Sequence, residues 1–218
     1  MTDEIPQNPS DDLAARWPLM VEFETIVRAA LGDDPDAAAF RVTGATLDVP
    51  SRTITPRYTG APAGRRTHPE GKRYWMPDRP TIVDLAARTT ASRSLRWDAE
   101  SRSVSPIPED WPDAMRRARP GIFDCELSIG DGWVDLLEAY CGRLEEWHEL
   151  MPFNQVKEKF GGIRLYSANG RRSDDIELQL IAEHLSFFIC EVCGAPGRCR
   201  NDHGWYTTRC NEHASRRG

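Results

Sequence analysis

The chain has 218 residues, of which 39% are hydrophobic, 9% aromatic and 28% charged. This composition is typical of a folded globular protein and too apolar for a wholly disordered one. The longest nearly apolar run, Leu185–Cys190, is far shorter than the roughly 20 residues of a membrane span, and the acidic, polar start argues against a secretory signal peptide. We therefore expect a cytoplasmic protein with no membrane partner.

The net charge of −6 is unevenly distributed along the chain. Residues 1–40 and 120–189 are strongly acidic, whereas residues 41–119 and 190–218 carry more bases than acids. Segments of opposite charge attract one another within one molecule at least as readily as they attract a partner. A cluster of prolines between 106 and 120 places the main boundary near residue 120. We therefore predict a flexible N-terminus (1–10), one module at 11–119, a second unit at 120–189 and a short end at 190–218.

The first half of the chain alternates helix and strand patterns. Apolar residues at helical spacing from Leu19 to Leu31 predict an amphipathic helix that ends at Gly32. Two short strands are expected at 40–47 and 52–55, a short helix at 80–88, and a hairpin that pairs 95–97 with 103–104. Proline and glycine concentrate between Pro50 and Pro80, which predicts a loop there. This half is expected to be a small α+β module.

The second half has the clearest periodicity. A helix opened by Asp131 is predicted, with its acidic residues, Asp135 among them, mostly outside the apolar stripe. The stripe consists of Trp133, Leu137, Tyr140, Leu144, Trp147 and Met151. Two strands are expected at 155–160 and 163–166, hinged at Gly161 and Gly162, and a second helix from Ser173 to Phe188. The fold class predicted for the whole chain is therefore α+β.

Four of the six cysteines lie in the segment 190–218. Cys190 and Cys193, followed by Cys210 and His213, have the spacing of a tetrahedral zinc site. Gly194 permits the tight turn that lets the first two thiolates reach one ion. Cys210 and His213 would face the same point from the first turn of a short helix, and the residues between the two pairs suit a hairpin. A cytoplasmic chain would not keep these cysteines oxidised as disulfides.

This spacing predicts a structural Zn²⁺ held by Cys190, Cys193, Cys210 and His213, because four protein ligands leave no open position for water. The segment 190–218 would then be a treble-clef-like zinc finger packed on the preceding unit. Whether Cys199 or His203 replaces His213 as a ligand stays open at this point.

Four segments of the second half are distinctive. They are Gly132-Trp-Val-Asp-Leu-Leu, Gln155-Val-Lys-Glu-Lys-Phe-Gly-Gly-Ile-Arg, Cys190-Glu-Val-Cys-Gly-Ala-Pro-Gly and the stretch from Trp205 to His213. Together, over about residues 130–214, they resemble a set of uncharacterised bacterial proteins that are often borne by phages or prophages. The resemblance implies a zinc-bearing C-terminal end and a phage or mobile-element setting, and it implies no reaction.

No convergent set of catalytic residues accompanies the metal motif. The leading hypothesis is therefore a non-enzymatic, zinc-stabilised binding protein that acts on a host or defence-system macromolecule, with a protein as its partner. A metal-dependent nuclease of the treble-clef type is the remotest alternative. Such an enzyme needs a catalytic histidine in addition to the zinc ligands, and only His203 beside Asp202 offers one.

Nucleic-acid binding is the second hypothesis, because the loop at 57–75 mixes bases with aromatic residues. Its bases would contact phosphates and its tryptophan would stack on nucleobases, assisted by the basic C-terminal tail. The residues are Arg65, Arg66, Lys72, Arg73 and Trp75. The opposing interpretation is a solvated loop that Trp75 anchors to the core.

Three single residues also have predicted structural roles. Cys141 is expected in the core, and His184 is expected to be a hydrogen-bonded packing residue. The ring of Trp205 is expected to pack the C-terminal hairpin against the helix formed by residues 174–189.

Overall fold

The computed structural model describes residues 9–32, 35–48, 50–64, 77–147, 150, 152–167, 173–202 and 204–215. The fold class is mixed α+β, as the sequence predicted. The first half contains α1 (Pro9–Ala15), α2 (Trp17–Leu31), the 3₁₀ helix η1 (Pro35–Ala39), β1 (Arg41–Asp48), β2 (Thr53–Thr59), α3 (Arg79–Ser94), β3 (Trp97–Asp98), β4 (Ser103–Val104) and α4 (Trp111–Ala118). The second half contains β5 (Leu127–Ser128), η2 (Asp131–Trp133), α5 (Val134–Trp147), β6 (Phe153–Lys159), β7 (Gly162–Ser167), α6 (Ser173–Ser186), β8 (Arg198–Asp202), β9 (Trp205–Arg209) and α7 (Asn211–Ser215).

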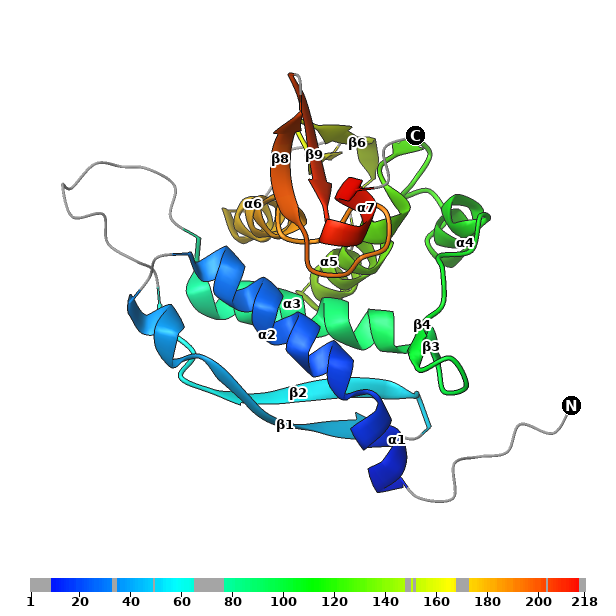
Figure 1. Ribbon diagram of the computed structural model, residues 1–218. Coiled ribbons are helices and arrows are strands. Elements are labelled where there is room, and N and C mark those ends of the chain that lie inside the picture. Colours follow the sequence, from blue (N-terminus) through cyan, green and yellow to red (C-terminus); the bar gives the residue numbers. More distant parts are fainter. Residues whose placement is uncertain are drawn as a thin grey trace, which may run out of the picture.

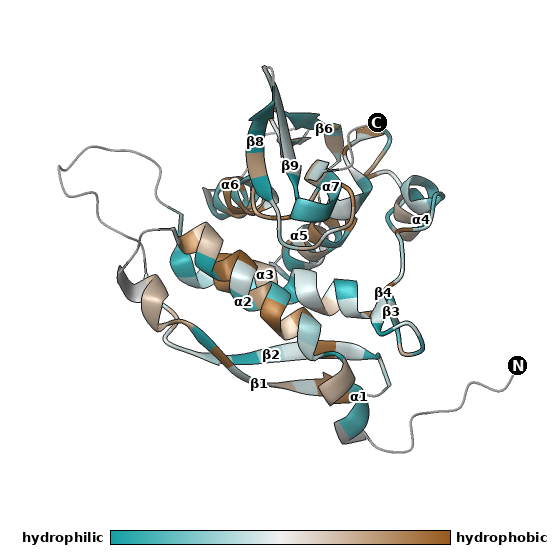
Figure 2. Cartoon of the chain, in the orientation of Figure 1, coloured by the Kyte–Doolittle hydropathy of each residue, from teal (hydrophilic) through white to brown (hydrophobic). Residues whose placement is uncertain are grey.

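Helix α2 follows the predicted amphipathic pattern. Its predicted apolar stripe from Leu19 to Leu31 is buried, whereas Val21, outside that stripe, is exposed. The helix ends at Gly32, whose N–H donates to the carbonyls of Arg28 and Ala29. Figure 2 shows the apolar segments of α2 alternating with polar ones along the helix. The predicted strand pair is also present: β1 and β2 form an antiparallel hairpin that lies against α2 and α3 (Figure 1).

Helices α3 and α4 differ from the sequence-based prediction. Helix α3 continues to Ser94, well beyond the predicted end at residue 88. The hydroxyls of Thr89 and Thr90 donate to carbonyls four residues earlier, so these polar residues are buried without an unsatisfied group. Helix α4 lies inside the proline cluster that predicts a boundary near residue 120. Pro112 is compatible with the helix because it occupies the first turn, where a missing N–H costs no helical hydrogen bond.

The second half is built around α5 and a small sheet. The predicted strands form β6 and β7, and β5 adds a parallel strand that the prediction lacked. Helix α6 covers the free edge of β7, where Ile163 N–H donates to Ser186 Oγ and Leu165 N–H to Glu183 Oε1.

The apolar stripe of α5 is buried from Trp133 to Leu144, whereas Trp147 is partly exposed and Met151 lies outside the described residues. Asp135 departs from the pattern, since it is buried rather than outside the stripe. There it accepts hydrogen bonds from Arg96 and Ser92, which compensate for burying the carboxylate.

One apolar cluster joins residues from Phe23 to Ile189 and includes side chains on both sides of residue 120. Helix α3 contacts α2, α5 and α6, and it thereby connects the two halves of the chain. The structure shows no gap in the packing at residue 120 among the described residues, and the division into units at 11–119, 120–189 and 190–218 stays a prediction. Figure 1 shows β8, β9 and α7, in orange and red, at the end of the molecule opposite the β1–β2 hairpin. Within the described residues, no helix is long and apolar enough to cross a membrane.

Candidate metal centre and the pocket beside it

The chain after α6 makes a tight turn that presents two cysteines. The N–H of Gly194 donates to the Cys190 carbonyl at 2.9 Å, and Cys190 N–H donates to the Ala195 carbonyl at 2.8 Å. Gly194 has a φ of +76°, a conformation that residues with a Cβ rarely adopt. This turn, Cys190–Gly194, is called the knuckle below.

The β8–β9 hairpin delivers the second pair of residues to the knuckle. Glu191 N–H donates to the Thr208 carbonyl at 2.7 Å, and Thr208 N–H donates back to Glu191 Oε2 at 3.1 Å. Cys210 follows β9 directly, and His213 lies one turn further along, in α7. The hairpin and the short helix predicted from the sequence are therefore both present.

The four side chains converge on one point. The ligand atoms of Cys190, Cys193, Cys210 and His213 all lie within 4.8 Å of one another. His213 Nδ1 is 3.2 Å from Cys210 Sγ and 3.6 Å from Cys190 Sγ, and the Sγ atoms of Cys193 and Cys210 are 4.0 Å apart. A zinc tetrahedron with Zn–S of about 2.3 Å and Zn–N of about 2.0–2.1 Å has edges of about 3.6–3.8 Å. The cluster therefore has the dimensions to hold a metal ion.

The cluster also favours a thiolate. A hydrogen bond from the Cys193 thiol, assisted by backbone N–H groups, lowers the pKa of Cys190 to about 4. The proton shared with Cys190 raises the pKa of Cys193. Because the thiolate is the form of cysteine that binds metals, Cys190 is prepared to act as a ligand at neutral pH.

Three residues that sequence reasoning had not assigned to the site hold the knuckle in place. Gly132 N–H donates to the Glu191 carbonyl at 2.9 Å, and a Cβ on Gly132 would lie 2.1 Å from the Cys190 carbonyl oxygen. The indole N–H of Trp133 donates to the Ile189 carbonyl at 2.8 Å. Arg93, on α3, donates to the Cys193 carbonyl and pairs with Glu22 of α2. The distinctive Gly132-Trp133 pair was a signal for this role, whereas Arg93 stands in no motif.

Other candidate residues lie elsewhere. Cys199 is exposed on β8 and is not part of the cluster, so among the described residues His213 is the one that completes the set. His203 lies outside the described residues. The basic-loop candidates also lie outside them, and the nucleic-acid interface predicted there stays a prediction; these residues are Arg65, Arg66, Lys72, Arg73 and Trp75.

Cys141 and His184 have the predicted roles. Cys141 is fully buried, and burial raises the pKa of its thiol. His184 Nε2 donates to the Ala30 carbonyl at 2.8 Å across the contact between α6 and α2.

The prediction for Trp205 was wrong. Its side chain is 79% exposed and does not pack the hairpin against α6, because Thr208 provides the buried contact of β9 instead. The Thr208 hydroxyl donates to the Gly161 carbonyl at 2.5 Å, which ties the hairpin to the β6–β7 turn.

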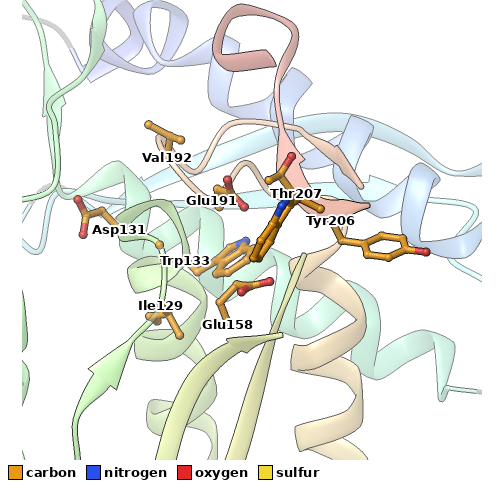
Figure 3. A pocket seen from close by; sticks show the side chains of 10 residues that line it. Ile129, Asp131, Trp133, Glu158, Glu191, Val192, Tyr206 and Thr207 are labelled. Carbon is orange, nitrogen blue, oxygen red and sulfur yellow. The ribbon is translucent and has the colours of Figure 1, made fainter. Parts of the chain in front are cut away.

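A pocket of about 430 Å³ adjoins the knuckle (Figure 3). It lies between the loop before α5, the end of β6, the knuckle and β9. The buried ring of Trp133 lines it together with three carboxylates, Asp131, Glu158 and Glu191. Its other lining residues are Ile129, Gly130, Val192, Trp205, Tyr206 and Thr207.

Comparisons with models of protein families, with curated proteins and with solved structures gave no match for this chain. The resemblance to phage-borne bacterial proteins therefore stays a prediction, and the arguments that follow are based on the residues themselves.

Proposed function

We propose that the chain is a non-enzymatic binding protein whose C-terminal end is stabilised by one structural Zn²⁺. The observation that carries the proposal is the convergence of Cys190, Cys193, Cys210 and His213 from a knuckle, a hairpin and a short helix. Three thiolates and one imidazole form a ligand set that suits zinc, in a treble-clef-like arrangement. Four protein ligands complete a tetrahedron and leave no position for a reacting water, so the metal acts on stability.

The partner in this proposal is another protein. Large aromatic side chains are costly to expose, and contiguous exposed apolar groups often mark an interaction site. Trp205 and Tyr206 are 79% and 43% exposed, and both belong to the hairpin that the metal ligands anchor. The resemblance to phage-borne proteins extends the proposal to a host or defence-system target.

Metal analysis of the freshly purified protein tests the first part. We expect one zinc per chain in the wild type and a loss of zinc in Cys190→Ser. Cys199→Ser is the matched control, because Cys199 is exposed and outside the cluster, and it should retain zinc fully. Wild-type protein that is purified without chelators and contains no zinc would contradict the proposal.

Capture of partners from a bacterial lysate tests the second part. We expect the zinc-loaded chain to retain a discrete protein whether or not the lysate is treated with nuclease. Capture that disappears after nuclease treatment, and in a variant with Arg65, Arg66, Lys72 and Arg73 replaced together, would instead support nucleic-acid binding.

A further inference from the structure

The pocket beside the knuckle is negatively charged. No lysine or arginine is present among its described lining residues, whereas Asp131, Glu158 and Glu191 contribute carboxylates. Glu191 is already neutralised, since its Oε1 lies 2.8 Å from Arg209 Nε. The charge that an incoming ligand meets therefore comes mainly from Glu158 and Asp131.

These two carboxylates can still accept hydrogen bonds from a ligand. Glu158 Oε1 accepts the Gly161 N–H at 2.7 Å, and Asp131 Oδ1 accepts the Trp111 indole N–H at 2.8 Å. Within the described part of the chain, neither forms an ion pair. Both residues are exposed, and Figure 3 shows Glu158 beside the indole ring of Trp133 and Asp131 further out.

One aromatic ring stands next to this charge, because Trp205 lines the pocket. Figure 3 shows the ring of Tyr206, the next residue of β9, pointing away from the pocket, and Phe160 contacts it there edge to face at a ring separation of 6.0 Å. Phe160 is 60% exposed and has a φ of +54°, a left-handed conformation that is unfavourable for a bulky residue. Glycine or asparagine would fit this turn with less strain, so the exposed ring is kept at the expense of local stability.

We propose that this pocket, here called the Trp205 pocket, binds an arginine side chain on an exposed segment of a partner protein. A guanidinium stacks on an indole face and at the same time donates paired hydrogen bonds to a carboxylate. Trp205 supplies the aromatic face and Glu158 the carboxylate. A phosphate backbone is disfavoured, because Glu158 and Asp131 would repel it. The inference rests on the proposed protein-binding function.

A peptide titration followed by ¹H–¹⁵N NMR tests the inference on the zinc-loaded full chain. The probe is acetyl-Gly-Arg-Gly-amide, and its matched control carries citrulline, a neutral isostere of arginine. We expect the arginine peptide to shift the Trp205 indole resonance, which is identified by its absence from Trp205→Ala. The citrulline peptide should bind roughly tenfold more weakly, because it cannot form charge-assisted hydrogen bonds.

Substitutions of the pocket residues test where the arginine peptide binds. Trp205→Ala and Glu158→Gln should each weaken binding of the arginine peptide by roughly tenfold. The first removes the aromatic face that stacks on the guanidinium, and the second removes the negative charge that pairs with it. The glutamine retains an oxygen that can accept the Gly161 N–H. Trp17→Ala and Glu100→Gln are the matched controls, because they remove an exposed tryptophan and an exposed negative charge that do not line the pocket. Both variants should bind the arginine peptide as the wild type does.

Three results would overturn the inference. These are equal binding of the two peptides, shifts confined to residues outside the pocket, and binding of oligothymidylate in place of the arginine peptide at Trp205. Its failure is distinguishable from failure of the proposed function. A partner captured equally well by the wild type and by Trp205→Ala would refute the pocket and leave protein binding intact, whereas a chain that captures no protein refutes both.

Discussion

At the scale of single residues, Gly132 is a position where one methyl group changes the metal site. A Cβ there would lie 2.1 Å from the Cys190 carbonyl oxygen and 2.5 Å from the Gly194 nitrogen, both of which are backbone atoms of the knuckle. We expect Gly132→Ala to destabilise the fold by about 1–3 kcal/mol, the usual cost of overpacking. Urea unfolding of the zinc-loaded protein measures this change.

Gly142→Ala is the control for that substitution. Gly142 lies in α5, and an added Cβ would meet no atom within 4 Å. Because alanine is the better helix former, this variant should be stabilised by up to about 1 kcal/mol. Equal unfolding midpoints for the two variants would show that Gly132 does not support the knuckle.

The two tryptophans of the pocket should respond in opposite ways to truncation. Trp133 is fully buried and its indole N–H is hydrogen-bonded, so Trp133→Ala should cost about 3–5 kcal/mol. Trp205 is 79% exposed, so Trp205→Ala should change stability by less than about 0.5 kcal/mol. Thermal unfolding of both variants checks this. A large loss in Trp205→Ala would mean that the ring packs on the fold after all.

At the scale of elements, periodicity predicted the helices whose position depends only on packing an apolar face against the core. Helix α2 and the start of α5 follow from their apolar spacing, because every residue of that stripe contributes to the core. The second half of α3 was missed since Thr89, Thr90 and Arg93 are polar yet buried, and only their tertiary or i−4 hydrogen bonds make that burial acceptable. No single-sequence pattern contains those partners.

The contact between α6 and α2 gives the fold a dependence on pH. Burial lowers the pKa of His184 below its usual value near 6.5, because desolvation penalises the charged ring more than the hydrogen bond to the Ala30 carbonyl favours it. The unfolded chain then binds a proton more readily than the folded one, so stability is present above pH 6.5 and falls as pH decreases below it. Urea unfolding between pH 5.5 and 7.5 should show this loss, and His184→Gln should reduce its slope. An unchanged slope in the variant would assign the pH dependence to other groups.

At the scale of the whole molecule, the segment that carries the metal ligands is held by hydrogen bonds from distant parts of the fold. The spacing of Cys190, Cys193, Cys210 and His213 could be predicted because their ligand chemistry restricts them to neighbouring positions in a short segment. Their support could not, since it comes from distant parts of the chain: Arg93 of α3 bonds the knuckle and in turn pairs with Glu22 of α2. The knuckle, in the second half, is thereby connected to two helices of the first half.

Removal of the metal should therefore loosen one end of the molecule and the contacts that reach it, and leave the far end intact. Zinc-binding energy is folding energy in a small segment, so we expect a chelator to increase hydrogen exchange throughout 190–215 and at 130–133, where Gly132 bonds the knuckle. The β1–β2 hairpin lies at the opposite end of the molecule (Figure 1) and should keep its protection. Arg93→Met should reproduce part of the effect at 190–194 with zinc still bound. Exchange that stays unchanged at 190–215 after complete removal of zinc would exclude a structural role for the metal.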